Sequence, residues 1–170
     1  MSLVRRRLLV LACFSIVSVF APRAHAQQYI LGGSAGLATG IAGGGGENSV
    51  LERARTRIRL AVDLRVDEFP KDIFAIAMVA ELEPHASVGL DLRYLRMLSK
   101  KIEVNAGAIG FLYPASLIGP VAGANYHLPI GTTGNLVVGP EFNVFVIGTD
   151  LPSNSVIWQA LLQVGFHVDL

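Results

Sequence analysis

Four arginines stand at alternate positions early in the sequence and form its densest group of chemically active side chains. They are Arg53, Arg55, Arg57 and Arg59. If this segment is a β-strand, all four guanidinium groups lie on one face, because successive side chains of a strand point to opposite faces. Such a ladder would face anions such as phosphate or lipopolysaccharide, because a planar guanidinium matches phosphate oxygens with paired hydrogen bonds.

The same arginines have candidate acidic partners further along the chain. An antiparallel hairpin centred on Pro70 places Arg57 opposite Glu83 and Arg59 opposite Glu81. Opposite charges that face each other on neighbouring strands stabilise a sheet. We therefore expect two ion pairs in this hairpin. Basic and acidic residues are nearly balanced over the positions that share this face, which favours ion pairing over an anion-binding ladder.

A second candidate pair consists of Glu103 and His127, which oppose each other in a hairpin centred on Ala115. Nucleophilic catalysis would need a serine beside the histidine as well. Leu128 and Pro129 follow His127 instead, so we predict a hydrogen-bonded polar pair and no catalytic residue. The histidines beyond residue 26 have no metal-ligand spacing, and we expect no metal and no cofactor.

The elements that must carry these residues are strands, because apolar and polar residues alternate with a period of two. The last segment is the clearest example. One of its faces is apolar throughout and consists of Val156, Trp158, Ala160, Leu162, Val164, Phe166, Val168 and Leu170. No apolar run is long and uninterrupted enough for a transmembrane helix, which needs about 20 residues.

The sequence predicts eight strands separated by segments rich in Gly, Pro, Asn and Ser. Their ranges are 29–41, 53–67, 73–83, 87–97, 102–113, 117–128, 136–147 and 156–170. Strands of this length suit a tilted bilayer crossing. We therefore expect an all-β fold, an eight-stranded antiparallel up-and-down transmembrane β-barrel with both chain ends on the periplasmic side.

Small residues occupy the predicted inner face of the first strand. These residues are Gly32, Ser34, Gly36, Ala38 and Gly40. An eight-stranded barrel has room only for its own inward side chains. We expect this strand to leave space for the long arginine side chains of the strand beside it. Five aromatic residues, Tyr29, Phe74, Tyr94, Tyr126 and Phe166, are expected to point outward near the periplasmic ends of their strands.

Residues 1–26 have the order of a secretory signal peptide. Arg5, Arg6 and Arg7 precede an apolar stretch, and Ala24-His25-Ala26 follows it as a cleavage site. We expect the mature barrel to span residues 27–170. The signal segment contains the one cysteine of the chain, so cysteine chemistry is excluded from the mature part. A formal net charge of +1 without a basic block argues against nucleic-acid binding.

This combination of signal peptide, eight strands, polar interior and amphipathic final strand resembles the small outer-membrane barrels. Those are the families of the outer-membrane protein A transmembrane domain and outer-membrane protein X. The terminal Phe166-x-Val168-x-Leu170 is similar to their assembly signal, although it ends in Leu instead of an aromatic residue. The only long connection, residues 42–52, is Gly-rich, so large receptor loops are not expected.

The resemblance implies an outer-membrane protein of a Gram-negative bacterium. Its expected partners are outer-membrane lipid, lipopolysaccharide and the barrel assembly machinery, which would bind the final strand, Val156 to Leu170. The expected role is structural or that of a narrow pore with a charge-paired lumen. Two alternatives are a lipid-modifying barrel enzyme and a soluble periplasmic lipocalin-like barrel for an apolar ligand. The second alternative requires the apolar faces to point inward.

Overall fold

The computed structural model describes residues 29–45, 51–82, 86–149, 151 and 155–169, and the side chains of these residues except 45 and 51–54. The predicted signal peptide, residues 1–26, lies outside the described residues, and so does Glu83. Among the described residues no helix is long and apolar enough to cross a membrane.

The described part of the chain contains nine strands joined by turns. They are β1 (Tyr29–Gly45), β2 (Leu51–Val66), β3 (Asp72–Glu81), β4 (Ser87–Met97), β5 (Ile102–Tyr113), β6 (Leu117–Ile130), β7 (Gly134–Phe145), β8 (Ile147–Gly148) and β9 (Val156–Asp169). The short β8 continues the path of β7 beyond Val146 and, like β7, pairs with β6. Together β7 and β8 form one wall strand, so the barrel has eight.

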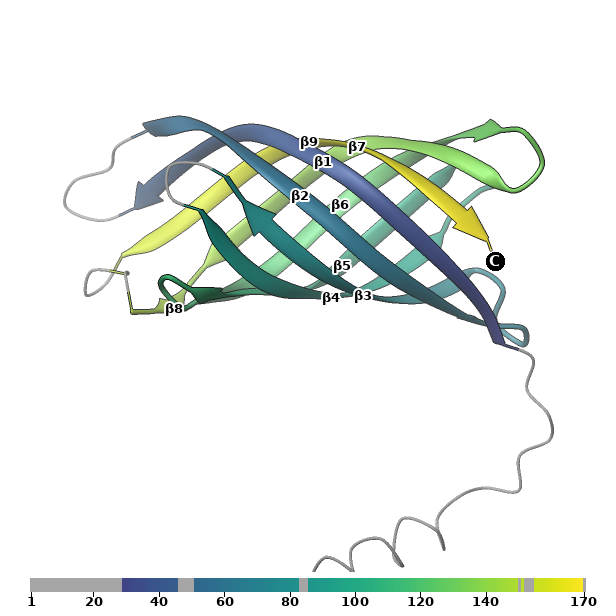
Figure 1. Cartoon of the computed structure of the whole chain (residues 1–170), viewed down its shortest axis with the longest axis horizontal. Helices are drawn as coiled ribbons and strands as arrows, with labels where there is room; N and C mark the ends of the chain where they lie inside the picture. The colour runs from purple at the N-terminus through teal and green to yellow at the C-terminus, as the bar shows by residue number, and fades with distance from the viewer. Residues whose placement is uncertain (1–28, 46–50, 83–85, 150, 152–154, 170) are drawn as a thin grey trace, which may run out of the picture.

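The sheet closes on itself, as Figure 1 shows. All strands that pair in the sheet are antiparallel, and the pairing of β5 with β6 completes the ring. The last contact joins the two ends of the chain, because β1 pairs with β9 from Gly32–Asp169 to Gly45–Val156. The predicted eight-stranded antiparallel up-and-down barrel is confirmed.

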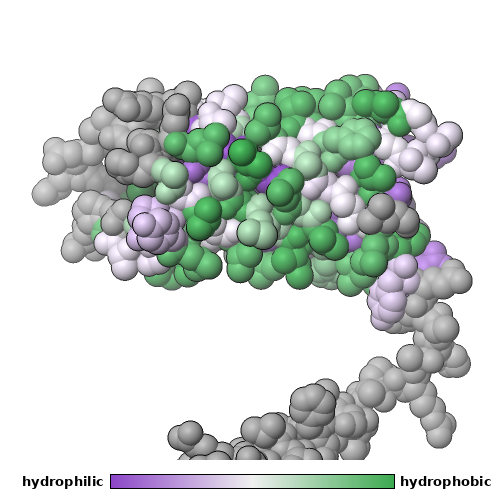
Figure 2. Space-filling view, in the orientation of Figure 1, coloured by the Kyte–Doolittle hydropathy of each residue, from purple (hydrophilic) through white to green (hydrophobic). Residues whose placement is uncertain are grey.

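Apolar side chains face outward from the barrel and most charged ones face inward. In β2 the outward Leu60 is 57% exposed, whereas the inward Arg57 is 1% exposed. Hydrophobic residues cover most of the outer face seen in Figure 2. A soluble barrel of lipocalin type would need the reverse arrangement, so that alternative is wrong.

The strand limits agree closely with the prediction in β4 and β5, and differ most in β1. That strand continues beyond residue 41 through the Gly-rich stretch, which the sequence analysis assigned to a loop. Strand β9 offers partners over this stretch, with Gly43 opposite Trp158 and Gly44 opposite Ile157. Backbone pairing therefore extends the strand where the side chains give no alternation.

The outward aromatic residues lie toward the end of the barrel where β1 begins and β9 ends, which we call the terminal end. All five predicted positions are exposed. The rings of Phe74 and Tyr94 are 5.4 Å apart, and the Tyr94 hydroxyl donates a hydrogen bond of 2.6 Å to Asp72. Aromatic residues at one level are typical of barrels that meet a membrane interface.

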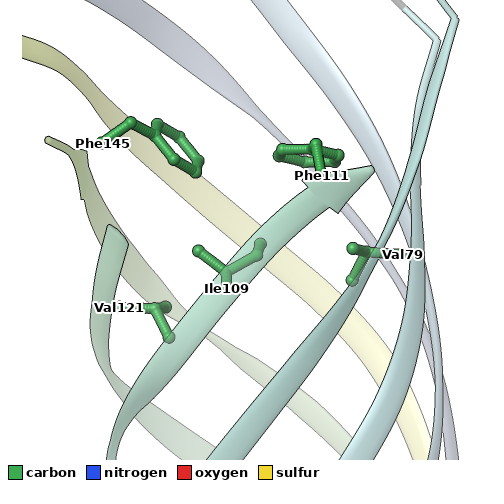
Figure 3. Packing of buried hydrophobic residues seen from close by; sticks show 5 residues of the cluster. All are labelled: Val79, Ile109, Phe111, Val121 and Phe145. Carbon is green, nitrogen blue, oxygen red and sulfur yellow. The ribbon is translucent and has the colours of Figure 1, made fainter. Parts of the chain in front are cut away.

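An apolar cluster lies inside the barrel toward the opposite end. It contains Val79, Ile109, Phe111, Val121 and Phe145, all of which turn toward the interior in Figure 3. The rings of Phe111 and Phe145 are 5.8 Å apart. This cluster was not predicted, because the inner face was expected to be polar.

Inward glycines mark places where neighbouring strands approach closely. A Cβ atom on Gly40 would lie 2.0 Å from the carbonyl oxygen of Ala160, and one on Gly107 would lie 1.9 Å from that of Leu92. These contacts are with backbone, which cannot move aside like a flexible side chain. At such positions glycine is needed because the neighbouring strand lies too close for a Cβ atom. Room for arginine side chains is the lesser effect.

We expect Gly40→Ala to destabilise the barrel by about 1–3 kcal/mol, the usual range for overpacking. The matched control is Gly44→Ala in the same strand, because a Cβ there would have no atom within 4 Å. Urea unfolding of the two variants in lipid vesicles, followed by fluorescence of the single tryptophan, Trp158, measures the difference. Equal unfolding midpoints would contradict the close approach.

Candidate functional site

The β2–β3 hairpin is centred one residue earlier than predicted. Its turn is closed by two backbone hydrogen bonds of 2.9 Å, from Phe69 to Val66 and from Asp72 to Phe69. The symmetric centre is therefore Phe69 instead of Pro70. This moves the register by two, so that Arg57 lies opposite Glu81.

The expected partners change accordingly. Arg57 contacts Glu81 at 2.6 Å. The predicted pair of Arg59 with Glu81 is not formed, and Arg59 lies 3.3 Å from Asp91 instead. The predicted partner of Arg57, Glu83, lies outside the described residues.

Arginines and carboxylates alternate across the barrel interior in one continuous series, which we call the ionic chain. Its order is Arg55, Glu81, Arg57, Glu141, Arg93, Asp91 and Arg59. The successive contacts are 3.0, 2.6, 2.6, 2.8, 2.5 and 3.3 Å. Each internal member has two partners of opposite charge. The guanidinium of Arg57 also donates to Gln159 and lies 5.4 Å above the Phe111 ring.

Small side chains on β3 allow Arg59 of β2 to reach past that strand. In register, Asp91 on β4 faces Ala77 on β3, and Ala77 faces Ala61 on β2. Both alanines point inward and are buried. Arg59 therefore reaches over β3 to a carboxylate two strands away. A longer residue at position 77 would occupy this path.

The ionic chain and the apolar cluster lie next to each other inside the barrel. Asp91 and Asn143 are both 0% exposed, and Glu141 is 3% exposed. These side chains are therefore covered almost completely by their neighbours at the level of the ionic chain.

A second polar group lies on the terminal side of the ionic chain. The register places Asn125 opposite Glu103, again shifted by two from the prediction. The side chain of His127 reaches diagonally, so that its Nε2 lies 3.0 Å from Oε2 of Glu103. Asn125 donates to the other carboxylate oxygen at 2.8 Å. The structure thus brings Glu103 and His127 together although they are not directly opposed.

His167 lies between two carboxylates in the same region. Its Nδ1 lies 3.0 Å from Asp63 and its Nε2 lies 3.1 Å from Asp169. Asp169 also approaches Arg65 at 3.6 Å. An imidazole can donate from both nitrogens only when both carry a proton. His167 therefore makes both hydrogen bonds at once only as an imidazolium.

A cavity of about 250 Å³ is lined by the Glu103–His127 pair and by His167 with its two carboxylates. Turn residues at the terminal end, including Pro70 and Lys100, also line it. One of its walls is almost bare backbone, because the inward positions Gly36 and Gly165 face each other in register. The small residues of β1 were expected to make room for arginines. They leave additional space that the arginines do not fill.

The remaining residues of the predicted arginine ladder are Arg53 and Arg55. Arg55 pairs with Glu81, and the side chain of Arg53 lies outside the described part of the chain. The described arginines of the ladder are thus all paired with carboxylates, and Arg55 and Arg57 share Glu81. Within the same limits, no group of three His, Cys, Asp or Glu residues is arranged to hold a metal ion.

Several inward residues were not identified as site residues from the sequence. They are Asp63, Arg93, Asn143, Gln159 and His167. Their alternation with apolar neighbours places each of them on the inner face, and that signal was available. The sequence gives no such signal for contacts across the lumen. Arg57 and Glu141, for example, come from strands that are not neighbours.

No protein-family model matches the chain, and no curated protein matches it in sequence. Among solved structures it is similar to Neisserial surface protein A, with a TM-score of 0.51 and 14% identity, covering 82% of this chain and 97% of that one. A second similar structure comes from the de novo design of transmembrane β-barrels. Its TM-score is 0.42 and its identity 11%, covering 79% of this chain and 95% of that one.

The likeness to Neisserial surface protein A concerns the fold, and the apolar outer face agrees with it. The chain has the fold of a transmembrane β-barrel. This confirms the resemblance to small outer-membrane barrels at the level of architecture.

We expect Glu141→Ala to destabilise the barrel by about 3–5 kcal/mol, because it leaves Arg57 and Arg93 buried without this partner. The control is Arg96→Ala, which breaks an exposed pair with Asp72 at 3.7 Å and should cost about 1 kcal/mol or less. Urea unfolding in vesicles compares the two. Similar midpoints would show that the ionic chain does not stabilise the fold.

Proposed function

We propose that this protein is an integral outer-membrane β-barrel of a Gram-negative bacterium with a structural role and a closed, charge-paired lumen. The observation that carries the proposal is the distribution of side chains, which is the reverse of that in a soluble protein. Its outer face is apolar, whereas Arg57, Glu81 and Glu141 are buried inside. Such a molecule is stable where hydrocarbon surrounds it.

Export would depend on residues 1–26, whose order of charge, apolar stretch and Ala-x-Ala is that of a signal peptide. Outer-membrane lipid and lipopolysaccharide would surround the wall. The final strand would bind the barrel assembly machinery, and β9 fits this role because its outward face is apolar from Ala160 to Phe166 and it closes the sheet with β1.

A closed lumen is favoured over an open pore. The ionic chain crosses the interior, and Phe111 and Phe145 lie beside it. A narrow pore would require these side chains to move together. An anion-binding ladder is less favoured, since Arg57 and Arg59 are engaged by carboxylates.

The alternative of a lipid-modifying enzyme is less favoured. Glu103 and His127 do form a pair, but the residue two positions after His127 is Pro129. None of the described hydrogen bonds of His127 involves a serine. We therefore do not assign an acyl-transfer reaction to this pair.

The full-length protein, expressed in a Gram-negative host, should fractionate with the outer membrane and begin at Gln27 after processing. It should also migrate differently on SDS gels before and after boiling, because a folded membrane barrel resists SDS. Replacing outward Leu92 by Arg should cost about 2–4 kcal/mol near the bilayer midplane and weaken the folded band. The control is Leu98→Arg in the β4–β5 turn. Recovery in the soluble periplasmic extract would overturn the proposal.

Wild-type protein in planar lipid bilayers should give no steady conductance. The double variant Arg57→Ala/Phe111→Ala removes two stacked side chains from the closure and should give discrete conductance steps. The control, Leu60→Ala/Phe74→Ala, shortens two outward side chains and should stay silent. Steady conductance of the wild type would replace the closed barrel with the narrow pore.

A further inference from the structure

The cavity at the terminal end is not needed for a structural barrel. The ionic chain forms its floor through Arg57 and Glu141, and residues from the turns line its other end. A barrel that served only as a wall could fill this space with side chains, as it does around Phe111. The bare backbone at Gly36 and Gly165 keeps the space open instead.

Four buried polar atoms of residues that line this cavity have no hydrogen-bond partner. Three are arginine nitrogens, Nε of Arg57, Nε of Arg65 and the terminal Nη2 of Arg59, and the fourth is Oδ1 of Asp63, an anionic acceptor. Asp63 is only 4% exposed. Buried polar atoms without partners are costly, so each calls for a group that completes it.

Two of these side chains flank a niche of small residues. Arg59 and Asp63 point inward on either side of Ala61 in β2, and Ala61 faces Ser34 of β1. Both Arg59 and Asp63 line the cavity, and so does Ser34. A ligand in the niche would therefore meet a positive group on one side and a negative group on the other.

The charge of the lining excludes a simple anion or cation site. Apart from Arg57 and Glu141 of the floor and the histidines His127 and His167, three basic and three acidic described side chains line the cavity. They are Arg59, Arg65 and Lys100, and Asp63, Glu103 and Asp169. Such a balance suits a ligand that is neutral overall but carries both charges.

The wall beside this polar niche is apolar. Ile73 and Leu95 form a small buried cluster, and Met97 packs against them. All three line the cavity. This surface would cover the hydrocarbon part of a ligand whose charged groups face Arg59 and Asp63.

We propose that this cavity binds a small zwitterion of the amino-acid class with an apolar side chain. Arg59 binds the carboxylate, Asp63 binds the ammonium group, and Ile73, Leu95 and Met97 contact the side chain. The ligand enters from the terminal end, since the ionic chain closes the other side. This site is independent of the proposed structural role and of any conductance.

Methionine methyl groups provide matched reporters. Met97 lines the cavity, whereas Met78 points outward and is 68% exposed. With [¹³C-methyl]methionine-labelled barrel in detergent micelles, titration with L-leucine should shift the Met97 signal saturably and leave Met78 unchanged. L-leucinamide lacks the carboxylate and 4-methylpentanoate lacks the ammonium group. Each should bind about tenfold or more weakly, the loss expected when a hydrogen bond to a charged group is removed.

Variants separate the site from general effects. Asp63→Asn and Arg59→Gln should each weaken L-leucine binding about tenfold or more, and Ser34→Leu should abolish it by filling the niche. Arg96→Gln changes an exposed charge outside the cavity and should bind like the wild type. Heat modifiability identifies variants that fold. If Arg59→Gln does not fold, Asp63→Asn and the two ligand analogues still test whether the cavity recognises both charges of L-leucine.

The proposal is overturned by any of three results. The first is the absence of a saturable Met97 shift with L-leucine at concentrations up to its solubility limit. The second is an equal shift at Met78, which would reflect the micelle. The third is equal binding of L-leucine and both singly charged analogues, because the paired-charge recognition would then be wrong.

Discussion

Each charged group that points into this barrel must find its partner among the other inward side chains. The interior of an eight-stranded barrel is too narrow for a water column beside them, and an isolated buried charge is very costly. The ionic chain meets this constraint by sharing. Glu81, Asp91 and Glu141 each contact two arginines, and Arg57 and Arg93 each contact two acids.

The sharing of carboxylates between arginines restricts the size of the side chains around them. Four long arginines can converge on three carboxylates only where the facing positions are small, as at Ala77 on β3. The apolar cluster around Phe111 packs on one side of the ionic chain, and the small residues of β1 leave space on the other. The interior therefore has a densely packed half and a hollow half.

Much of this architecture follows from the sequence, because a period of two separates the two faces of each strand. Eight strands and the inward position of Arg57 were predicted in this way. Register was less accessible: the β2–β3 turn is centred on Phe69, and backbone hydrogen bonds in the turn determine that position. Contacts across the lumen, such as Arg57 with Glu141, join strands that are not neighbours and depend on three-dimensional closure. No pairing rule for adjacent strands predicts them.

The pairing of β1 with β9 also determines how the molecule can assemble. Gly32 and Asp169, which meet at this seam, belong to the first and the last described strands. The seam forms only after the final strand is available, and such distant contacts make folding slow. Until then two unpaired strand edges remain open to wrong partners. The chain therefore needs protection during the interval between synthesis of its first strand and docking of its last.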